Sequence, residues 1–132
     1  MGAGATDPLT ALVGLEVDQV WVWSLLRLVF ELGDDSTRDT YLDTSEFAFT
    51  DPDGLPHHVN VASNPIETGC VLSVLHERVT EVSEDDGTLC LSFANGARLV
   101  CPPDPDYESW IVSLADALIV CTPGGDVANV SY

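Results

Sequence analysis

Alternating apolar and polar residues dominate this chain and predict a protein built mainly from β-strands. Successive side chains of a strand point to opposite faces, so an apolar residue at every second position marks a strand with one buried face. The alternation is clear in residues 24–32, where Leu26, Leu28 and Phe30 share one side. Gly, Pro, Asn and Asp separate such segments. We expect strands at 15–23, 24–32, 38–50 (one bent strand or two short ones), 78–83, 88–93, 97–101, 110–114 and 117–122, with an edge strand at 126–132.

The turn at Asn95 and Gly96 predicts a hairpin, and its register decides where two cysteines point. A two-residue loop would set Cys90 opposite Cys101, whereas a three-residue loop with a left-handed Gly96 pairs positions that sum to 190. The second register gathers the apolar residues of both strands on one face, so we expect it. It leaves Cys90 and Cys101 on opposite faces, where they cannot form a disulfide.

One helix is predicted at about 65–76, because Asn64 is a good N-cap, Pro65 suits the first helical position and Glu67 follows the cap by three residues. Its apolar face at helical spacing would contain Ile66, Cys70, Val71, Val74 and Leu75. The expected fold class is therefore α+β: a mostly antiparallel twisted sheet, or a partly rolled barrel, of about seven or eight strands with this one helix.

The length of 132 residues suits one domain with a sizeable core. We expect a flexible N-terminal tail at 1–11 and a single globular domain at 12–132. No stretch approaches the roughly 18 apolar residues that span a bilayer, and the first residues lack the pattern of a secretion signal. A cytoplasmic location is therefore expected.

Charge is the most unusual property of the composition. There are 22 acidic residues and 4 basic ones, which gives a formal charge of −18, and the sequence has no lysine. A protein needs a clustered cationic patch to bind nucleic acids or anionic membranes, so neither is expected as a partner. A basic protein is favoured, because a field of one sign speeds encounter with the opposite sign. The hydrophobic fraction of 45% places this charge on a folded body.

The predicted strands leave most acidic residues in turns, near 33–35, 51–53, 84–86 and 104–108. If these turns lie on one side of the fold, they form a binding face; if they are spread evenly, they serve solubility alone. The candidate partner-binding carboxylates are Asp34, Asp35, Glu84, Asp85, Asp86, Asp104, Asp106 and Glu108.

No catalytic constellation is recognisable, so we expect neither an enzyme nor a cofactor nor a metal site. The four cysteines are widely spaced and lack a Cys-x-x-Cys pair, which favours buried free thiols. His57 and His58 are neighbours in an extended segment and would point to opposite sides. Trp21, Trp23 and Trp110 are expected in the core. Asp106 is expected to cap a short turn at 107–110.

Three segments resemble a domain-of-unknown-function family of small actinobacterial proteins: Gly87-Thr-Leu-Cys-Leu-Ser-Phe93, Pro103-Asp-Pro-Asp-Tyr-Glu-Ser-Trp110 and Pro123-Gly-Gly125. The resemblance extends from about Gly14 to Val130. Val130-Ser131-Tyr132 departs from it, because the family has a tryptophan near the last strand. The resemblance implies a small cytoplasmic β-rich protein and no established activity.

The sequence therefore favours a non-enzymatic acidic binding protein, of the immunity type that neutralises a basic partner such as a toxin. One alternative is a cation-binding protein or small metal-dependent enzyme that uses Asp104, Asp106 and Glu108 with His57 or His58. A second alternative is a barrel that holds a small apolar ligand. A monomer and a homodimer are both compatible with the expected edge strand.

Overall fold

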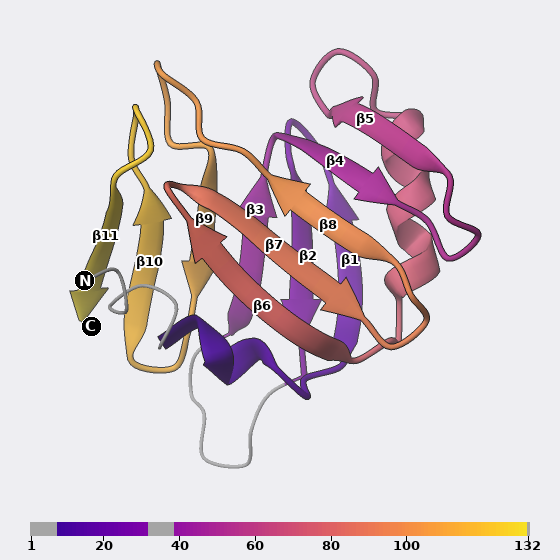
Figure 1. Ribbon diagram of the computed structural model, residues 1–132, viewed down its shortest axis with the longest axis horizontal. Coiled ribbons are helices and arrows are strands. Elements are labelled where there is room, and N and C mark those ends of the chain that lie inside the picture. The colour runs from indigo at the N-terminus through magenta and orange to yellow at the C-terminus, as the bar shows by residue number, and fades with distance from the viewer. Residues whose placement is uncertain (1–7, 32–38, 132) are drawn as a thin grey trace.

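A computed structural model describes residues 8–31 and 39–131 and shows two antiparallel β-sheets packed face to face (Figure 1). The six-stranded sheet has the order β1 (Val17–Val22), β2 (Leu26–Phe30), β3 (Thr40–Thr44), β9 (Trp110–Ser113), β10 (Ala117–Cys121) and β11 (Val127–Ser131). The five-stranded sheet has the order β5 (Pro56–Asn60), β4 (Glu46–Thr50), β8 (Arg98–Cys101), β7 (Thr88–Phe93) and β6 (Val79–Asp85).

The hydrophobic core lies between the two sheets. Alternate residues of the strands face inward, for example Leu28 and Phe30 from β2 and Phe47 and Phe49 from β4, and each is at most 1% exposed. The chain passes from one sheet to the other at Ser45, where β3 ends and β4 begins. The strands of the two layers cross obliquely (Figure 1).

The predicted single sheet of seven or eight strands is wrong in number and in layering. The described residues contain eleven strands in two sheets, and each sheet ends in two edge strands, so neither closes into a barrel. For residues 38–50 we expected one bent strand or two short ones. The second alternative is confirmed, because this segment contains the two short strands β3 and β4. The sequence analysis missed β5, because this edge strand begins with Pro56, His57 and His58 and has one fully buried residue, Val59.

The predicted register of the hairpin between β7 and β8 is confirmed. Leu91 pairs with Leu99 and Ser92 with Arg98, and Gly96 adopts the left-handed backbone (φ 92°) that the three-residue loop requires. Leu89, Leu91 and Phe93 are buried, as are Ala97, Leu99 and Cys101, whereas Cys90 lies half-buried on the other face. All four cysteines are free thiols.

The predicted helix is present as a 3-10 helix, η2 (Glu67–Val74). Its buried residues are Thr68, Val71 and Val74, and this spacing of three matches the three residues per turn of a 3-10 helix. The predicted α-helical face was wrong, since Ile66 is 90% exposed. The expected cap contact does occur, because the Asn64 side chain accepts a hydrogen bond from the Glu67 backbone N–H (3.4 Å).

A short 3-10 helix, η1 (Thr10–Leu12), covers one opening of the sandwich beside β6. Residues 1–11 were expected to form a flexible tail, but within the described part of this segment Leu9 is fully buried in the core. No helix within residues 8–31 and 39–131 has the length and apolar character needed to cross a membrane.

Candidate functional site

Three connections that are distant in sequence meet at one end of the sandwich. They are the β6–β7 turn, the loop from β8 to β9, and the β10–β11 turn, which lie together at the upper left of Figure 1. The backbone N–H of Gly124 donates to the carbonyl of Asp104 (2.9 Å), which joins the second connection to the third. We call this part of the molecule the acidic end and define it by Glu84, Asp85, Asp86, Asp104, Asp106 and Asp126.

Two glycines make this close approach of the turns possible. A Cβ atom added to Gly87 would lie 2.6 Å from the carbonyl oxygen of Gly125, and one added to Gly125 would lie 3.1 Å from that of Asp86. Both glycines have a positive φ, 87° and 101°, which side chains disfavour. The buried indole N–H of Trp110 donates to the Gly87 carbonyl (2.8 Å) and fastens the β6–β7 turn to β9.

Hydrogen bonds within each connection hold the carboxylates in place. Glu84 accepts a hydrogen bond from the Gly87 backbone N–H (2.9 Å). Asp104 accepts from the backbone N–H groups of Asp106 (2.8 Å) and Tyr107 (3.3 Å). The predicted cap by Asp106 is therefore wrong, because Asp104 supplies the turn acceptor and Trp110 already begins β9.

The acidic end contains little positive charge. Within the described part of the chain, no arginine or histidine forms an ion pair with Asp85, Asp86, Asp104, Asp106 or Asp126. Burial raises the pKa of the Cys121 thiol beneath these turns, and the charges of Glu84 and Asp126 raise it further. Glu84 and Asp126 therefore lie close enough to act on one group.

Not every predicted carboxylate belongs to the acidic end. Asp34 and Asp35 lie outside the described residues. Glu108 is on the same loop as Asp104 but lines a separate cavity of about 110 Å³ with Leu25 and Asp43. Sequence reasoning missed Asp126, although the Pro-Gly-Gly turn beside it was recognised.

The turn at 51–53 lies at the opposite end of the five-stranded sheet. Thr50 at the end of β4 pairs with Arg98 at the start of β8, whereas Leu89 near the start of β7 pairs with Cys101 at the end of β8. Strand register therefore separates Asp51 and Asp53 from Asp85 and Asp86 by the length of the sheet.

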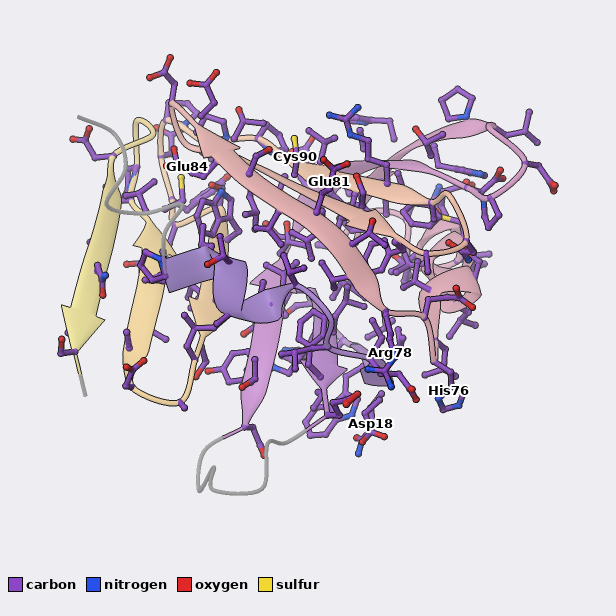
Figure 2. The ribbon with its side chains drawn as sticks, turned by 60° about the horizontal axis from the view of Figure 1, so that its bottom comes forward. Asp18, His76, Arg78, Glu81, Glu84 and Cys90 are labelled. Carbon is purple, nitrogen blue, oxygen red and sulfur yellow. The ribbon has the colours of Figure 1, made fainter. Side chains whose placement is uncertain are left out.

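Arg78 and His76 form ion pairs away from the acidic end. Arg78 contacts Glu16 (3.6 Å) and Glu31 (3.4 Å), and His76 contacts Glu16 (3.5 Å). Figure 2 shows Arg78 and His76 near the beginning of β6, with Glu84 near its other end. Arg78 and His76 therefore lie near the start of β6, away from the acidic end, and pair there with Glu16 and Glu31.

A second cluster surrounds Arg27 on the outer face of the six-stranded sheet. Its guanidinium donates two hydrogen bonds to Asp43 (2.7 and 2.8 Å), and the charged Asp43 raises the pKa of Arg27. The rings of Trp21, Trp23 and Tyr41 lie 5.7, 5.3 and 3.9 Å from the guanidinium carbon. Trp21 and Trp23 are 45% and 47% exposed, so their predicted place in the core is wrong; Trp110 alone of the three is buried.

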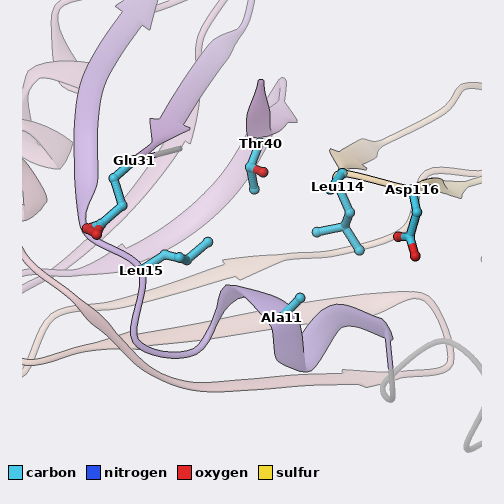
Figure 3. A pocket seen from close by; sticks show the side chains of 7 residues that line it. Ala11, Leu15, Glu31, Thr40, Leu114 and Asp116 are labelled. Carbon is cyan, nitrogen blue, oxygen red and sulfur yellow. The ribbon is translucent and has the colours of Figure 1, made fainter. Parts of the chain in front are cut away.

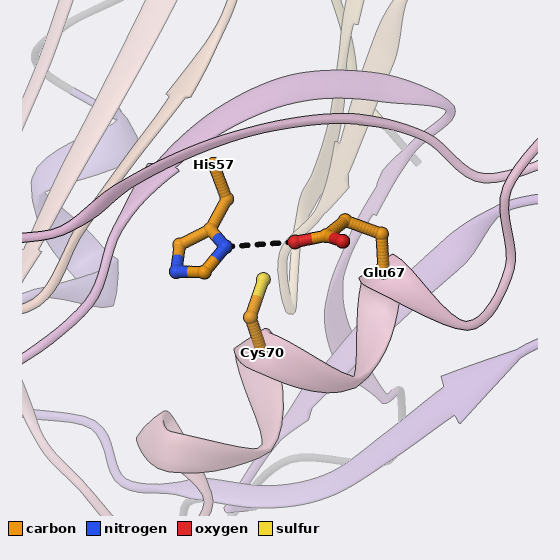
Figure 4. A group of neighbouring side chains, drawn as sticks. All are labelled: His57, Glu67 and Cys70. Atoms are coloured by element: carbon orange, nitrogen blue, oxygen red, sulfur yellow. Dashed lines mark hydrogen bonds and ion pairs between the residues drawn. The ribbon is translucent and has the colours of Figure 1, made fainter.

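A third cluster joins β5 to η2. The two ring nitrogens of His57 contact Glu67 (Nδ1 to Oε2, 2.8 Å) and Asp51 (Nε2 to Oδ2, 3.0 Å), and these carboxylates raise the pKa of His57. Cys70 lies beside Glu67 on η2 and faces the same imidazole (Figure 4). His58 points away and approaches Glu46 (3.4 Å), which agrees with the expected alternation.

The predicted cation site at Asp104, Asp106 and Glu108 would need His57 or His58 as a further ligand, but neither histidine lies beside these carboxylates. Asp104 accepts hydrogen bonds from its own loop, and His57 contacts carboxylates at the other end of the sheet. Among the described residues, the side chains close enough together to hold a metal ion are His57, Glu67 and Cys70. Sequence reasoning missed this set, although Glu67 and Cys70 have the spacing of neighbours on a helix.

An open cavity of about 300 Å³ lies between η1, β3 and the β9–β10 turn (Figure 3). Leu15 and Leu114 supply apolar walls, and Glu31 and Asp116 lie at its rim. The Glu31 carboxylate already accepts a hydrogen bond from the Glu16 backbone N–H and pairs with Arg78. No group in this cavity indicates a specific ligand.

Comparison with known proteins identifies one family. The model described as "Family of unknown function (DUF6188)" matches residues 8–131, which is nearly the whole chain. No curated protein matches the sequence.

Proposed function

The chain belongs to DUF6188, a family of unknown function, and we propose that this member is a non-enzymatic protein that binds a cationic partner through its acidic end. The observation that carries the proposal is the convergence of three acidic connections. Clustered carboxylates produce a local negative potential, which attracts arginine and lysine side chains of a partner. The same potential repels nucleic-acid phosphates.

Rigidity supports binding over mere solubility. The contact between Gly87 and Gly125, the Trp110 hydrogen bond and the Asp104 turn fix the backbone that carries the carboxylates. A site that is already ordered loses less conformational entropy when a partner binds. Carboxylates scattered for solubility need no such support.

An exposed aromatic residue within the β8–β9 loop supplies apolar contact area. Tyr107 follows Asp106 directly and is 65% exposed. Tryptophan, tyrosine and arginine are enriched among the residues that dominate binding energy at protein interfaces. A basic toxin, for example a nuclease, presents the complementary charge, and the protein would then act as its immunity partner.

The proposal is tested by the affinity of a poly-arginine peptide for matched variants of the full chain. One variant neutralises Asp85, Asp86, Asp104, Asp106 and Asp126 to Asn, which keeps the acceptor oxygen of Asp104. The control neutralises five exposed carboxylates elsewhere and therefore has the same net charge: Asp18, Asp39, Asp53, Glu81 and Asp116. We expect the first variant to bind the peptide at least tenfold more weakly than the control does. A tenfold difference in Kd corresponds to about 1.4 kcal/mol of binding free energy. Equal affinities of the two variants would contradict the proposal.

A further inference from the structure

We propose that His57, Glu67 and Cys70 form a binding site for one zinc-type divalent transition-metal ion. The site lies at the opposite end of the five-stranded sheet from the acidic end, and it does not depend on the function proposed above. Its three ligand atoms lie within 4.8 Å of one another and come from two elements, β5 and η2 (Figure 4).

The local fold aims these side chains at one point. In a 3-10 helix, residues three apart lie directly above one another, so Glu67 and Cys70 share a face of η2. On the edge strand β5, His57 pairs with the buried Phe49 and therefore points toward the inner side of the sheet. The contacts between β5 and η2 bring the imidazole over that helical face.

The donor set suits zinc. Zinc binds thiolate sulfur, imidazole nitrogen and carboxylate oxygen at about 2.0–2.3 Å, which separates tetrahedral ligands by roughly 3.3–3.8 Å. His57 Nδ1 and Glu67 Oε2 are 2.8 Å apart, and all three ligand atoms lie within 4.8 Å of one another, so side-chain rotations can bring them to the tetrahedral separation. Calcium and magnesium prefer oxygen ligands alone and would be poor occupants. Three protein ligands leave a fourth position for water, and all three side chains are partly exposed, which gives the ion a path of entry.

The residues around His57 support this assignment. Histidines that bind a metal through one nitrogen usually donate the other N–H to a carboxylate, which fixes the ring orientation. Asp51 accepts from His57 Nε2 (3.0 Å) and leaves Nδ1 directed at Glu67 and Cys70. Asp51 is itself held by the backbone N–H groups of Asp53 (2.9 Å) and Leu55 (3.0 Å). The Phe49 ring, with its centroid 6.3 Å from that of His57, borders the imidazole on the core side.

Metal binding here displaces protons. In the metal-free protein, the thiol pKa of Cys70 is raised to about 11 by burial and by Glu67, and the carboxylates around His57 favour its imidazolium. The ion takes the place of the proton on Nδ1 and of the thiol proton, while Nε2–H stays hydrogen-bonded to Asp51. Up to about two protons are therefore released for each ion bound.

The first test adds cobalt(II) to the metal-free full chain and records its absorption spectrum. We expect the charge-transfer band of a cobalt–thiolate bond, which saturates at one ion per chain. Cys70→Ser should abolish the band, and His57→Gln should weaken binding at least tenfold. Cys90→Ser and His58→Gln are the matched controls and should leave the band unchanged, because Cys90 lies on the outer face of β7 and His58 points away from the site toward Glu46.

Zinc supplies the second readout, because an ion that binds the folded state alone raises the melting temperature. At a concentration about a hundredfold above Kd, we expect a rise of roughly 10 °C for a chain of this size. Glu67→Gln, at a partly exposed position, should remove most of this rise. A cobalt spectrum without a thiolate band, or equal zinc shifts for the parent, Cys70→Ser and Glu67→Gln proteins, would overturn the proposal.

Discussion

Replacing Gly87 by alanine tests whether the turns of the acidic end are in contact. The added Cβ would lie 2.6 Å from the oxygen and 2.7 Å from the Cα atom of Gly125, both backbone atoms. A contact this short forces one of the two turns to move. Movement of Gly87 would disturb the hydrogen bond from Trp110 to its carbonyl, which is buried.

Gly54→Ala provides the matched control for this substitution. Gly54 has nearly the same φ, 86° against 87°, but a Cβ atom there meets nothing within 4 Å. The control therefore has the backbone penalty alone, about 1–2 kcal/mol. Gly87→Ala adds the displacement of the turn and the loss of a buried hydrogen bond partner, about 1–3 kcal/mol more. We expect totals of about 1–2 kcal/mol for Gly54→Ala and about 2–5 kcal/mol for Gly87→Ala.

Urea unfolding followed by circular dichroism measures both losses. The two variants should have the same slope m as the parent protein and differ in midpoint. A loss of about 2–5 kcal/mol is a large part of the roughly 5–15 kcal/mol that is typical of a domain, so the Gly87→Ala midpoint should fall further than that of Gly54→Ala. Equal midpoints for the two variants would refute the close packing of these turns.

Three further outcomes are expected. Arg27→Ala should destabilise the protein by about 1–3 kcal/mol in thermal unfolding, because it leaves the buried Asp43 carboxylate without its partner. The double variant Arg27→Ala, Asp43→Ala should lose less stability, and an equal loss for the single and the double variant would be inconsistent with this reason. In the metal-free protein, the ion pairs of His57 stabilise the fold below pH 6.5, and this contribution is lost as the pH rises through the raised pKa of His57. Asp51→Asn should lower that pKa in an NMR titration. Cys101, whose pKa burial raises to about 12, should react with thiol reagents only after unfolding.

The strand pattern was predictable where alternation is strong. Leu89, Leu91 and Phe93 alternate with polar residues and face Ala97, Leu99 and Cys101, so the buried face alone decided the hairpin register. β5 shows the limit of this reasoning. An edge strand has few buried residues, and His57 and His58 give no apolar period even though their side chains do alternate.

The division of the strands into two sheets was not predictable from periodicity. A strand that is buried on one face has the same apolar alternation in a single sheet and in a sandwich of two sheets. The helix type was also hidden, since residues three apart, such as Val71 and Val74, share a face in an α-helix and in a 3-10 helix. Trp21 and Trp23 were expected in the core, but the Arg27–Asp43 pair on the outer face gives these rings a cation to cover.

Both candidate sites depend on contacts between segments that are far apart in sequence. The acidic turns were recognised one by one, but their convergence rests on Gly87 meeting Gly125 and on Gly124 bonding to Asp104. The site on η2 needed β5, which was not predicted, to bring His57 to Glu67 and Cys70. The spacing of Glu67 and Cys70 was visible in the sequence and is typical of two ligands on one helix face. Without His57 these two residues had no third ligand, so no metal site was predicted on η2.

NMR mapping of the wild-type chain with a poly-arginine peptide tests the central claim most directly. At moderate salt, we predict that the largest amide shift changes occur at 84–88, 103–108 and 123–126, the segments that form the acidic end. The turn at 51–55 is also acidic but lies at the other end of the sheet, so its amides should change little. Shift changes spread evenly over all acidic turns would mean that the charge serves solubility alone, and would contradict the proposed binding function.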